Sequence, residues 1–199
     1  MTPQMRTKER GNAVIEFALV SWVLLILLIG SAALGLSLAR SITCNQVCRA
    51  AGSMYVRGVD FSTNGAKDEL VRLAGPLGMT RTGGNGVVIL SKVTWISAAA
   101  CTAAGLSPCN ANKHVIMERL TIGNASLRSS AIGTPNASLI QPNGAVTNYM
   151  QDASAVANFP FLQLNTNEFA YVAESYFPSP GFDFAGWYTG TGTYSRYIF

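Results

Sequence analysis

The sequence predicts an α+β protein: a long N-terminal helix crosses a membrane, and a small domain follows whose antiparallel sheet packs on the C-terminal half of that helix. Three observations support this fold class. Apolar residues make up 49% of the 199 residues and charged residues only 12%, about half the charged fraction of a typical soluble domain. Residues 17–39 form one apolar run without a charge. Strand-like segments rich in β-branched residues appear only after residue 86, so the sheet belongs to the second part of the chain.

The charge-free run is long enough to span a bilayer. As a helix, residues 17–39 reach about 35 Å, whereas a hydrocarbon core is about 30 Å thick. Arg6, Lys8 and Arg10 precede it, and the positive-inside rule then places the N-terminus in the cytoplasm and the domain outside, N-in and C-out. A cleaved secretory signal peptide, cut near the small residues 30–33, is the alternative. The apolar run continues beyond such a cut, which favours a retained helix.

Glu16 is the residue of this helix that requires an explanation. It stands between the apolar triplets 13–15 and 17–19. A charge costs on the order of 2.5–3.5 kcal/mol at the centre of a bilayer and less near its surface, so an acid here is a candidate functional residue. The alternative is an interfacial acid that marks the edge of the membrane. Glu16 is, however, the fifth residue after Gly11, which follows a short polar leader.

The spacing of Gly11, Asn12, Glu16 and Phe17 resembles the type III signal of type IV pilins and pseudopilins. The segment RGNAVIEFALV, residues 10–20, is similar in particular to the start of the TadE-like minor pseudopilins of the tight adherence pilus system. A looser likeness extends to residues 48–55 and 171–178. Asn12 departs from the small or apolar residue that is more familiar after the junction.

This resemblance implies a structural function. A prepilin peptidase, which is an aspartyl membrane protease, would cleave on the cytoplasmic side between Gly11 and Asn12, and the Glu16 carboxylate would pair with the new amino terminus of a neighbouring subunit. The implied partners are this peptidase, other pilin or pseudopilin subunits and the inner-membrane assembly platform. The implied location is the bacterial inner membrane, followed by the periplasm or a cell-surface pilus. The absence of a Cβ suits Gly11 to a narrow active site.

Hydrophobic periodicity and turn-forming residues divide the chain into three parts. Residues 1–11 form the leader, 12–57 the long helix and 58–199 the periplasmic or extracellular domain. Apolar residues at helical spacing carry the helix past the membrane to about residue 57, and a second helix is expected at 66–74, capped by Asn64 and with Asp68 and Glu69 in its first turn. Strands are expected at 87–96, 115–122 and 169–177, with a terminal strand at 194–199. Residues 122–167 are rich in Asn, Ser, Gly and Pro, so we expect loops and partner contacts there.

The four cysteines are consistent with an oxidising compartment. Cys101 and Cys109 enclose a short loop between two expected strands, and a disulfide between them would contribute about 2–3 kcal/mol. Cys44 and Cys48 are one helical turn apart, a spacing that suits a bond between them poorly. They are a reduced buried pair, a locally unwound bridge, or partners in crossed bridges to the loop.

Charge and motif content exclude several function classes. Residues 50–199 hold nine cations and eight anions, so the domain lacks the cationic excess of a nucleic-acid-binding surface. The chain contains no catalytic motif, and we expect no catalytic residue, cofactor or metal. His114, the single histidine, is expected to be a surface or capping residue, and Glu118 and Glu174 are expected to be solvated.

Two function classes therefore remain. The first is a minor pilin or pseudopilin. The second is a single-span or exported binding or adhesive protein whose helix is only an anchor or signal peptide. Aromatic residues near the C-terminus would form either an adhesive face or part of the core; they are Phe182, Phe184, Trp187, Tyr188, Tyr194, Tyr197 and Phe199.

Overall fold

A computed structural model describes residues 8–178 and 192–199, with side chains from residue 13 onward. The chain forms two compact units, Met1–Ala39 and Arg40–Phe199. The first helix, α1 (Lys8–Val56), contributes residues to both units. It begins within the expected leader, so Gly11 and Asn12 lie in helical backbone.

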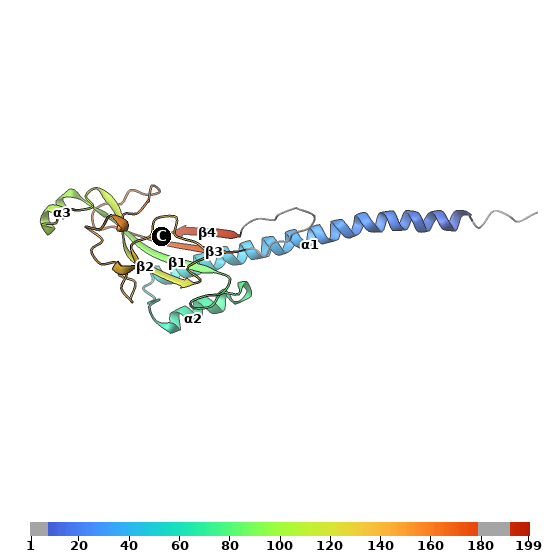
Figure 1. The fold of residues 1–199 in the computed structure, drawn as a ribbon, viewed down its shortest axis with the longest axis horizontal. Helices are drawn as coiled ribbons and strands as arrows, with labels where there is room; N and C mark the ends of the chain where they lie inside the picture. The colour runs from blue at the N-terminus through green and yellow to red at the C-terminus, as the bar shows by residue number, and fades with distance from the viewer. Residues whose placement is uncertain (1–7, 179–191) are drawn as a thin grey trace, which may run out of the picture. The chain divides into compact units, whose positions relative to one another are not determined.

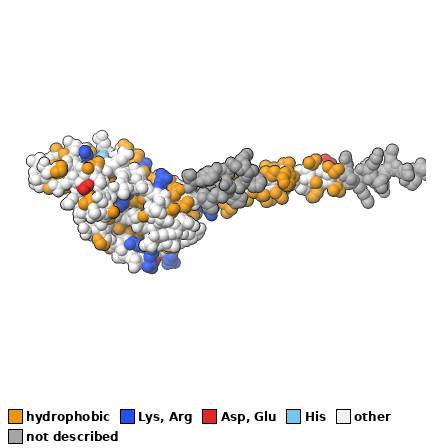
Figure 2. Space-filling model, viewed as in Figure 1, with side chains coloured by type: hydrophobic (Ala, Val, Ile, Leu, Met, Phe, Trp, Pro, Cys, Tyr) orange, Lys and Arg blue, Asp and Glu red, His pale blue; other side chains and the backbone are white. Residues whose placement is uncertain are grey.

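The first unit is the apolar part of α1. Most of its described side chains are exposed, including those of Phe17 at 75% and Trp22 at 68%, and most of the coloured side chains of this segment in Figure 2 are hydrophobic. Within the described residues, one helix is long and apolar enough to cross a membrane. By length and composition it fits a membrane anchor or a signal sequence.

The second unit is built on a four-stranded antiparallel sheet with the order β2-β1-β3-β4, seen side by side in Figure 1. The strands are β1 (Val87–Ile96), β2 (Lys113–Gly123), β3 (Phe169–Phe177) and β4 (Thr193–Ile198). Leu90 of β1 pairs with Leu120 of β2 and Ala173 of β3. The expected strands therefore form, and β2 starts two residues earlier than expected because its pairing with β1 extends to Lys113.

One face of the sheet packs with the C-terminal part of α1. Cys44, Val47, Cys48, Ala51 and Tyr55 are buried in one core cluster with residues of β1, β2 and β3. Their spacing of three and four residues places them on one side of the helix. Close approach also requires Gly52, where an added Cβ would overlap the ring of Phe199. The expected α+β arrangement is thus present for this part of the helix.

The second helix, α2 (Asn64–Leu73), adds Leu70 to the same cluster. Its N-cap position is Thr63, and Asn64 is already helical, so the expected cap at Asn64 is wrong. The first turn holds no acid, because the earlier start moves Asp68 and Glu69 into the second turn. A 3-10 turn at Gly75–Leu77 follows.

The irregular segment between β2 and β3 covers the other face of the sheet. It contains only two 3-10 turns, Ala137–Leu139 and Ala153–Ala155. It nevertheless buries Ile132, Val146 and Phe159 against Val93 and Val172 of the sheet. The segment that we expected to offer loops for partners therefore supplies six of the ten buried residues of this core cluster. A short helix, α3 (Ala98–Ala104), lies beyond one end of the sheet in Figure 1.

Candidate functional site

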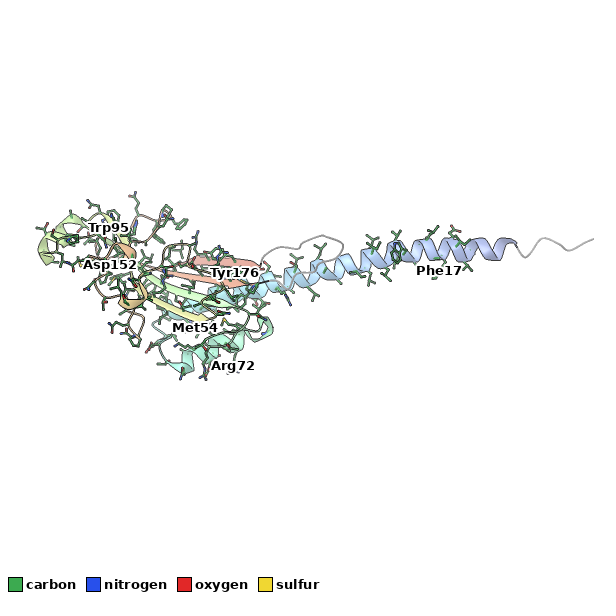
Figure 3. The ribbon with its side chains drawn as sticks, viewed as in Figure 1. Phe17, Met54, Arg72, Trp95, Asp152 and Tyr176 are labelled. Atoms are coloured by element: carbon green, nitrogen blue, oxygen red, sulfur yellow. A yellow bond between two sulfur atoms is a disulfide. The ribbon has the colours of Figure 1, made fainter. Side chains whose placement is uncertain are left out.

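The first candidate site is the segment around Glu16 in α1. The Glu16 side chain is exposed on the helix, and within the described part of the chain it has no hydrogen bond or ion pair. The Phe17 side chain stands free on the same helix in Figure 3. The segment therefore presents one carboxylate on an apolar surface. Among the described side chains, none is a hydrogen-bond or ion-pair partner of this carboxylate.

Asn12 and Glu16 are held in register by helical backbone. Both lie within α1, so they are one helical turn apart, about 6 Å along the axis. A chain that began at Asn12 would carry its amino group within the first helical turn. The positive end of the helix dipole also favours a carboxylate close to such a terminus.

The second candidate site is the pair of free thiols on α1. Cys44 and Cys48 are both fully buried and unbonded. The Cys44 Sγ lies 3.3 Å from the Ser175 Oγ, and the Cys48 Sγ lies 3.2 Å from the Ala173 carbonyl oxygen. Burial raises the pKa of Cys44 and raises that of Cys48 to about 11. Of the three alternatives, the structure therefore has the reduced buried pair, and these thiols are poor nucleophiles.

Cys101 and Cys109 form the expected disulfide, with their Cα atoms 6.0 Å apart. The bond connects α3 to the segment that leads into β2. Cys101 is buried with Ile96 and Val115 in a small core cluster at this end of the sheet. The bond therefore supports local structure, and it does not involve the thiols on α1.

A buried polar cluster surrounds Glu174 of β3, which is 1% exposed. Its carboxylate accepts hydrogen bonds from the Tyr194 hydroxyl at 2.5 Å, from the Ala131 backbone N–H at 2.9 Å and from the Ser130 hydroxyl. Burial, together with the hydrogen bond to this carboxylate, raises the pKa of Tyr194. The expected solvated position of Glu174 is therefore wrong, because the irregular segment covers this face of the sheet.

Arg119 of β2 is the positive charge that accompanies this cluster. It is 5% exposed and donates to the Gly133 carbonyl oxygen at 2.5 Å. Burial lowers the pKa of Arg119 to about 10, and attraction by Glu174 opposes that shift. Arg119 and Glu174 thus attract each other through space, and their separate hydrogen bonds hold the covering segment.

Glu118 differs from Glu174 because it lies on the helix-packed face of the sheet. Its Oε2 accepts a 2.8 Å hydrogen bond from the Tyr55 hydroxyl, and its Oε1 lies 3.5 Å from the Lys92 Nζ. Glu118 is only half-buried, so the solvated position expected for it is partly correct. Glu118 and Glu174 lie on opposite faces of the sheet. They therefore do not form a pair of adjacent carboxylates of the kind that glycoside hydrolysis uses.

His114 is half-buried and packs between aromatic rings, so the expected surface or capping role is only partly correct. Its ring centroid lies 4.9 Å from that of Trp95 and 5.4 Å from that of Phe159. Its Nε2 is buried without a hydrogen bond, and burial lowers the pKa of His114. In the described part of the chain, no group of three or more His, Cys, Asp or Glu residues is placed to hold a metal ion.

Three of the seven C-terminal aromatic residues lie in the described part of the chain, and these three pack on the domain. Tyr194 and Tyr197 are partly buried, and Phe199 is 41% exposed while its ring lies against α1 at Gly52. These three residues therefore support the core rather than a separate adhesive face. Phe182, Phe184, Trp187 and Tyr188 lie outside the described residues.

The comparisons with known proteins add no functional assignment. No protein-family model, no curated protein and no solved structure matches this chain. The function therefore has to be inferred from the residues and from the contacts described above.

Proposed function

We propose that this protein is a minor pilin or pseudopilin, a structural subunit for the assembly of a type IV-like, tight adherence pilus. The supporting observation is one carboxylate, Glu16, in the otherwise uncharged residues 11–39 of α1, one turn after the Gly11–Asn12 junction. A prepilin peptidase cleaves this junction in the bacterial inner membrane. The processed subunit keeps its complete apolar helix, and its domain lies on the periplasmic or cell-surface side.

Assembly follows from the electrostatics of that helix. Cleavage frees an ammonium group at Asn12, and a carboxylate surrounded by lipid is costly until an opposite charge reaches it. When a neighbouring subunit brings its ammonium group to Glu16, both charges are neutralised at one position along the helix. Glu16 thus selects the register between subunits. The partners are other pilin or pseudopilin subunits and the inner-membrane assembly platform.

The amino terminus of the mature chain tests this proposal. The full chain is produced in a bacterium that contains a prepilin peptidase, extracted from the membrane, and measured by N-terminal sequencing and intact mass. We expect a start at Asn12. A start at Met1 would instead identify an anchored binding protein, and a start near Ala33 would identify a signal peptide. Either result contradicts the proposal.

A pair of glycine variants makes this test specific. Gly11→Val places a branched side chain at the junction and should block cleavage. Gly30→Val is the matched control, because Gly30 lies in the same helix with no atom within 4 Å of an added Cβ. It should be processed normally. Cleavage of the Gly11→Val variant at an unchanged site and rate would show that the junction is not where we place it.

A further inference from the structure

A polar cavity of about 230 Å³ opens on the domain beside the last turn of α1. Its polar side chains come from separate parts of the chain: Tyr55 from α1, Asp60 from the following loop, Lys92 from β1, Glu118 from β2 and Asn143 from the segment after β2. Leu120 forms part of its apolar wall. The fold thus brings hydrogen-bonding groups from distant positions in the sequence to one cavity. Neither Glu16 nor a cysteine lines this cavity.

The charged groups of this cavity are held in place before any ligand binds. Tyr55 and Lys92 fix the two carboxylate oxygens of Glu118 from opposite ends. The Lys92 Nζ also lies 4.5 Å from the ring centroid of Phe169 and 5.5 Å from that of Tyr171. Cation–π contact and ion pairing together restrict the lysine side chain. A ligand therefore meets side chains whose conformational entropy is already reduced.

These groups retain hydrogen-bonding capacity. An ammonium group has three N–H donors, and Lys92 directs one charge contact to Glu118. Asn143 uses its Oδ1 to accept from the Ala145 N–H at 3.1 Å, which leaves its amide donors for a ligand. Asp60 uses Oδ1 to accept from the Ser62 N–H at 2.8 Å, and a carboxylate has about four acceptor positions. The cavity therefore offers both donors and acceptors.

The balance of charges restricts the kind of ligand. Lys92 and Glu118 form an ion pair and largely cancel each other. The remaining charge is the Asp60 carboxylate, which is exposed and therefore screened by water, so the cavity attracts ions of either sign only weakly. An apolar ligand would remove water from these groups without replacing its hydrogen bonds. Neutral hydroxyl groups fit best, because they donate to the carboxylates and accept from the ammonium and amide groups. The volume is smaller than the roughly 300–1,000 Å³ of pockets for drug-sized ligands, so it suits a single small ring.

We propose that this cavity binds one monosaccharide unit of a glycan. Lys92 and Asn143 donate to the sugar hydroxyl oxygens, while Glu118 and Asp60 accept from sugar hydroxyl groups. This binding is separate from cleavage at Gly11 and from pairing at Glu16, so it holds or fails independently of the pilin proposal.

The test measures sugar binding by the complete protein. The full chain is placed in phosphatidylcholine nanodiscs, which avoids detergents with sugar head groups. The methyl glycosides of glucose, galactose, mannose and N-acetylglucosamine are titrated by saturation-transfer difference NMR. We expect saturable binding of at least one glycoside. The absence of saturable binding for all four, with the domain folded, would overturn the proposal, as would preferential binding of spermidine or inorganic phosphate.

Matched variants locate the binding site. Glu118→Gln and Asn143→Ala should each weaken binding about tenfold or more, because the first replaces a charged acceptor by a neutral amide and the second removes an amide donor from the cavity. Glu69→Gln and Asn45→Ala make the same chemical changes at exposed positions outside it and should leave affinity unchanged. Circular dichroism confirms folding of each variant. Unchanged affinity in both cavity variants would place the sugar elsewhere and refute the assignment.

Discussion

The Tyr55 hydroxyl donates a 2.8 Å hydrogen bond to the Oε2 of Glu118 and so connects the last turns of α1 to strand β2. Tyr55 is 6% exposed, and burial together with the adjacent carboxylate raises its pKa. The phenol consequently stays protonated and remains a donor throughout the physiological pH range. Residues 63 positions apart in the sequence are thereby joined by one charge-assisted bond.

Removing this hydroxyl should destabilise the domain. We expect Tyr55→Phe to lower the free energy of unfolding by about 1.5–3 kcal/mol, the usual contribution of a hydrogen bond to a charged group. Urea denaturation of the full chain, followed by circular dichroism, measures the difference. Tyr149→Phe is the matched control, because the Tyr149 hydroxyl has no hydrogen bond among the described residues. Equal effects of the two substitutions would contradict this role.

Glu174 should be much more important for stability than an exposed glutamate. Glu174→Gln removes the negative charge beside Arg119 and turns one acceptor into an N–H donor facing Tyr194, Ser130 and Ala131. Leaving a buried hydrogen-bonding group unsatisfied costs about 1–3 kcal/mol and more for charged groups, and we expect a loss of this order in chemical denaturation. Glu69→Gln on the exposed surface of α2 should change stability by less than about 0.5 kcal/mol. A similarly small loss at Glu174 would show that its bonds contribute no net stability.

The two thiols on α1 should be unreactive in the folded protein. Because burial raises the pKa of Cys48 to about 11, about one molecule in a thousand carries a Cys48 thiolate at pH 8. We expect no alkylation by iodoacetamide in native conditions and two alkylated cysteines after addition of denaturant without reductant, as measured by intact mass. The bonded Cys101 and Cys109 serve as an internal control. Rapid native modification, or a mass that indicates a Cys44–Cys48 disulfide, would contradict this environment.

Glu16 should matter for assembly and not for processing. Glu16→Gln keeps the size of the side chain but removes its charge, so under the proposed function the ammonium group of a neighbouring subunit loses its partner. We expect incorporation into sheared filaments to fall about tenfold or more, since tenfold corresponds to 1.4 kcal/mol, while cleavage and membrane extraction stay normal. Ser21→Ala, a small polar-to-apolar change in the same helix, is the control. Filaments of unchanged number and composition with Glu16→Gln would refute the register function.

Local periodicity was sufficient to predict the main elements. The charge-free residues 17–39 lie in one helix, and β1 forms at the residues where β-branched side chains are concentrated. The disulfide between Cys101 and Cys109 was also predictable, because two cysteines that enclose a short loop are close in any compact arrangement. Each of these features depends on residues that are close to one another in the sequence.

Glu118 and Glu174 mark the limit of such prediction. Both acids occupy strands, and nothing in their local sequence distinguishes them. Strand pairing places Glu118 on the face beside α1 and Glu174 on the face beneath the irregular segment. That segment has the composition of an exposed loop, yet it buries Ile132 and Phe159. The cavity between Tyr55, Lys92 and Asn143 likewise required the pairing of β1 with β2.

The sequence alone determined the apolar helix, the position of Glu16 after Gly11, the strands and the loop disulfide, because backbone geometry fixes the period of each element within a few residues. The tertiary structure alone decided that Cys44 and Cys48 remain thiols, that Glu174 is buried and that Glu118 borders an open cavity. Those outcomes depend on which distant segments exclude water from a given face of the sheet, and side-chain alternation along one strand contains no information about the segment that covers it.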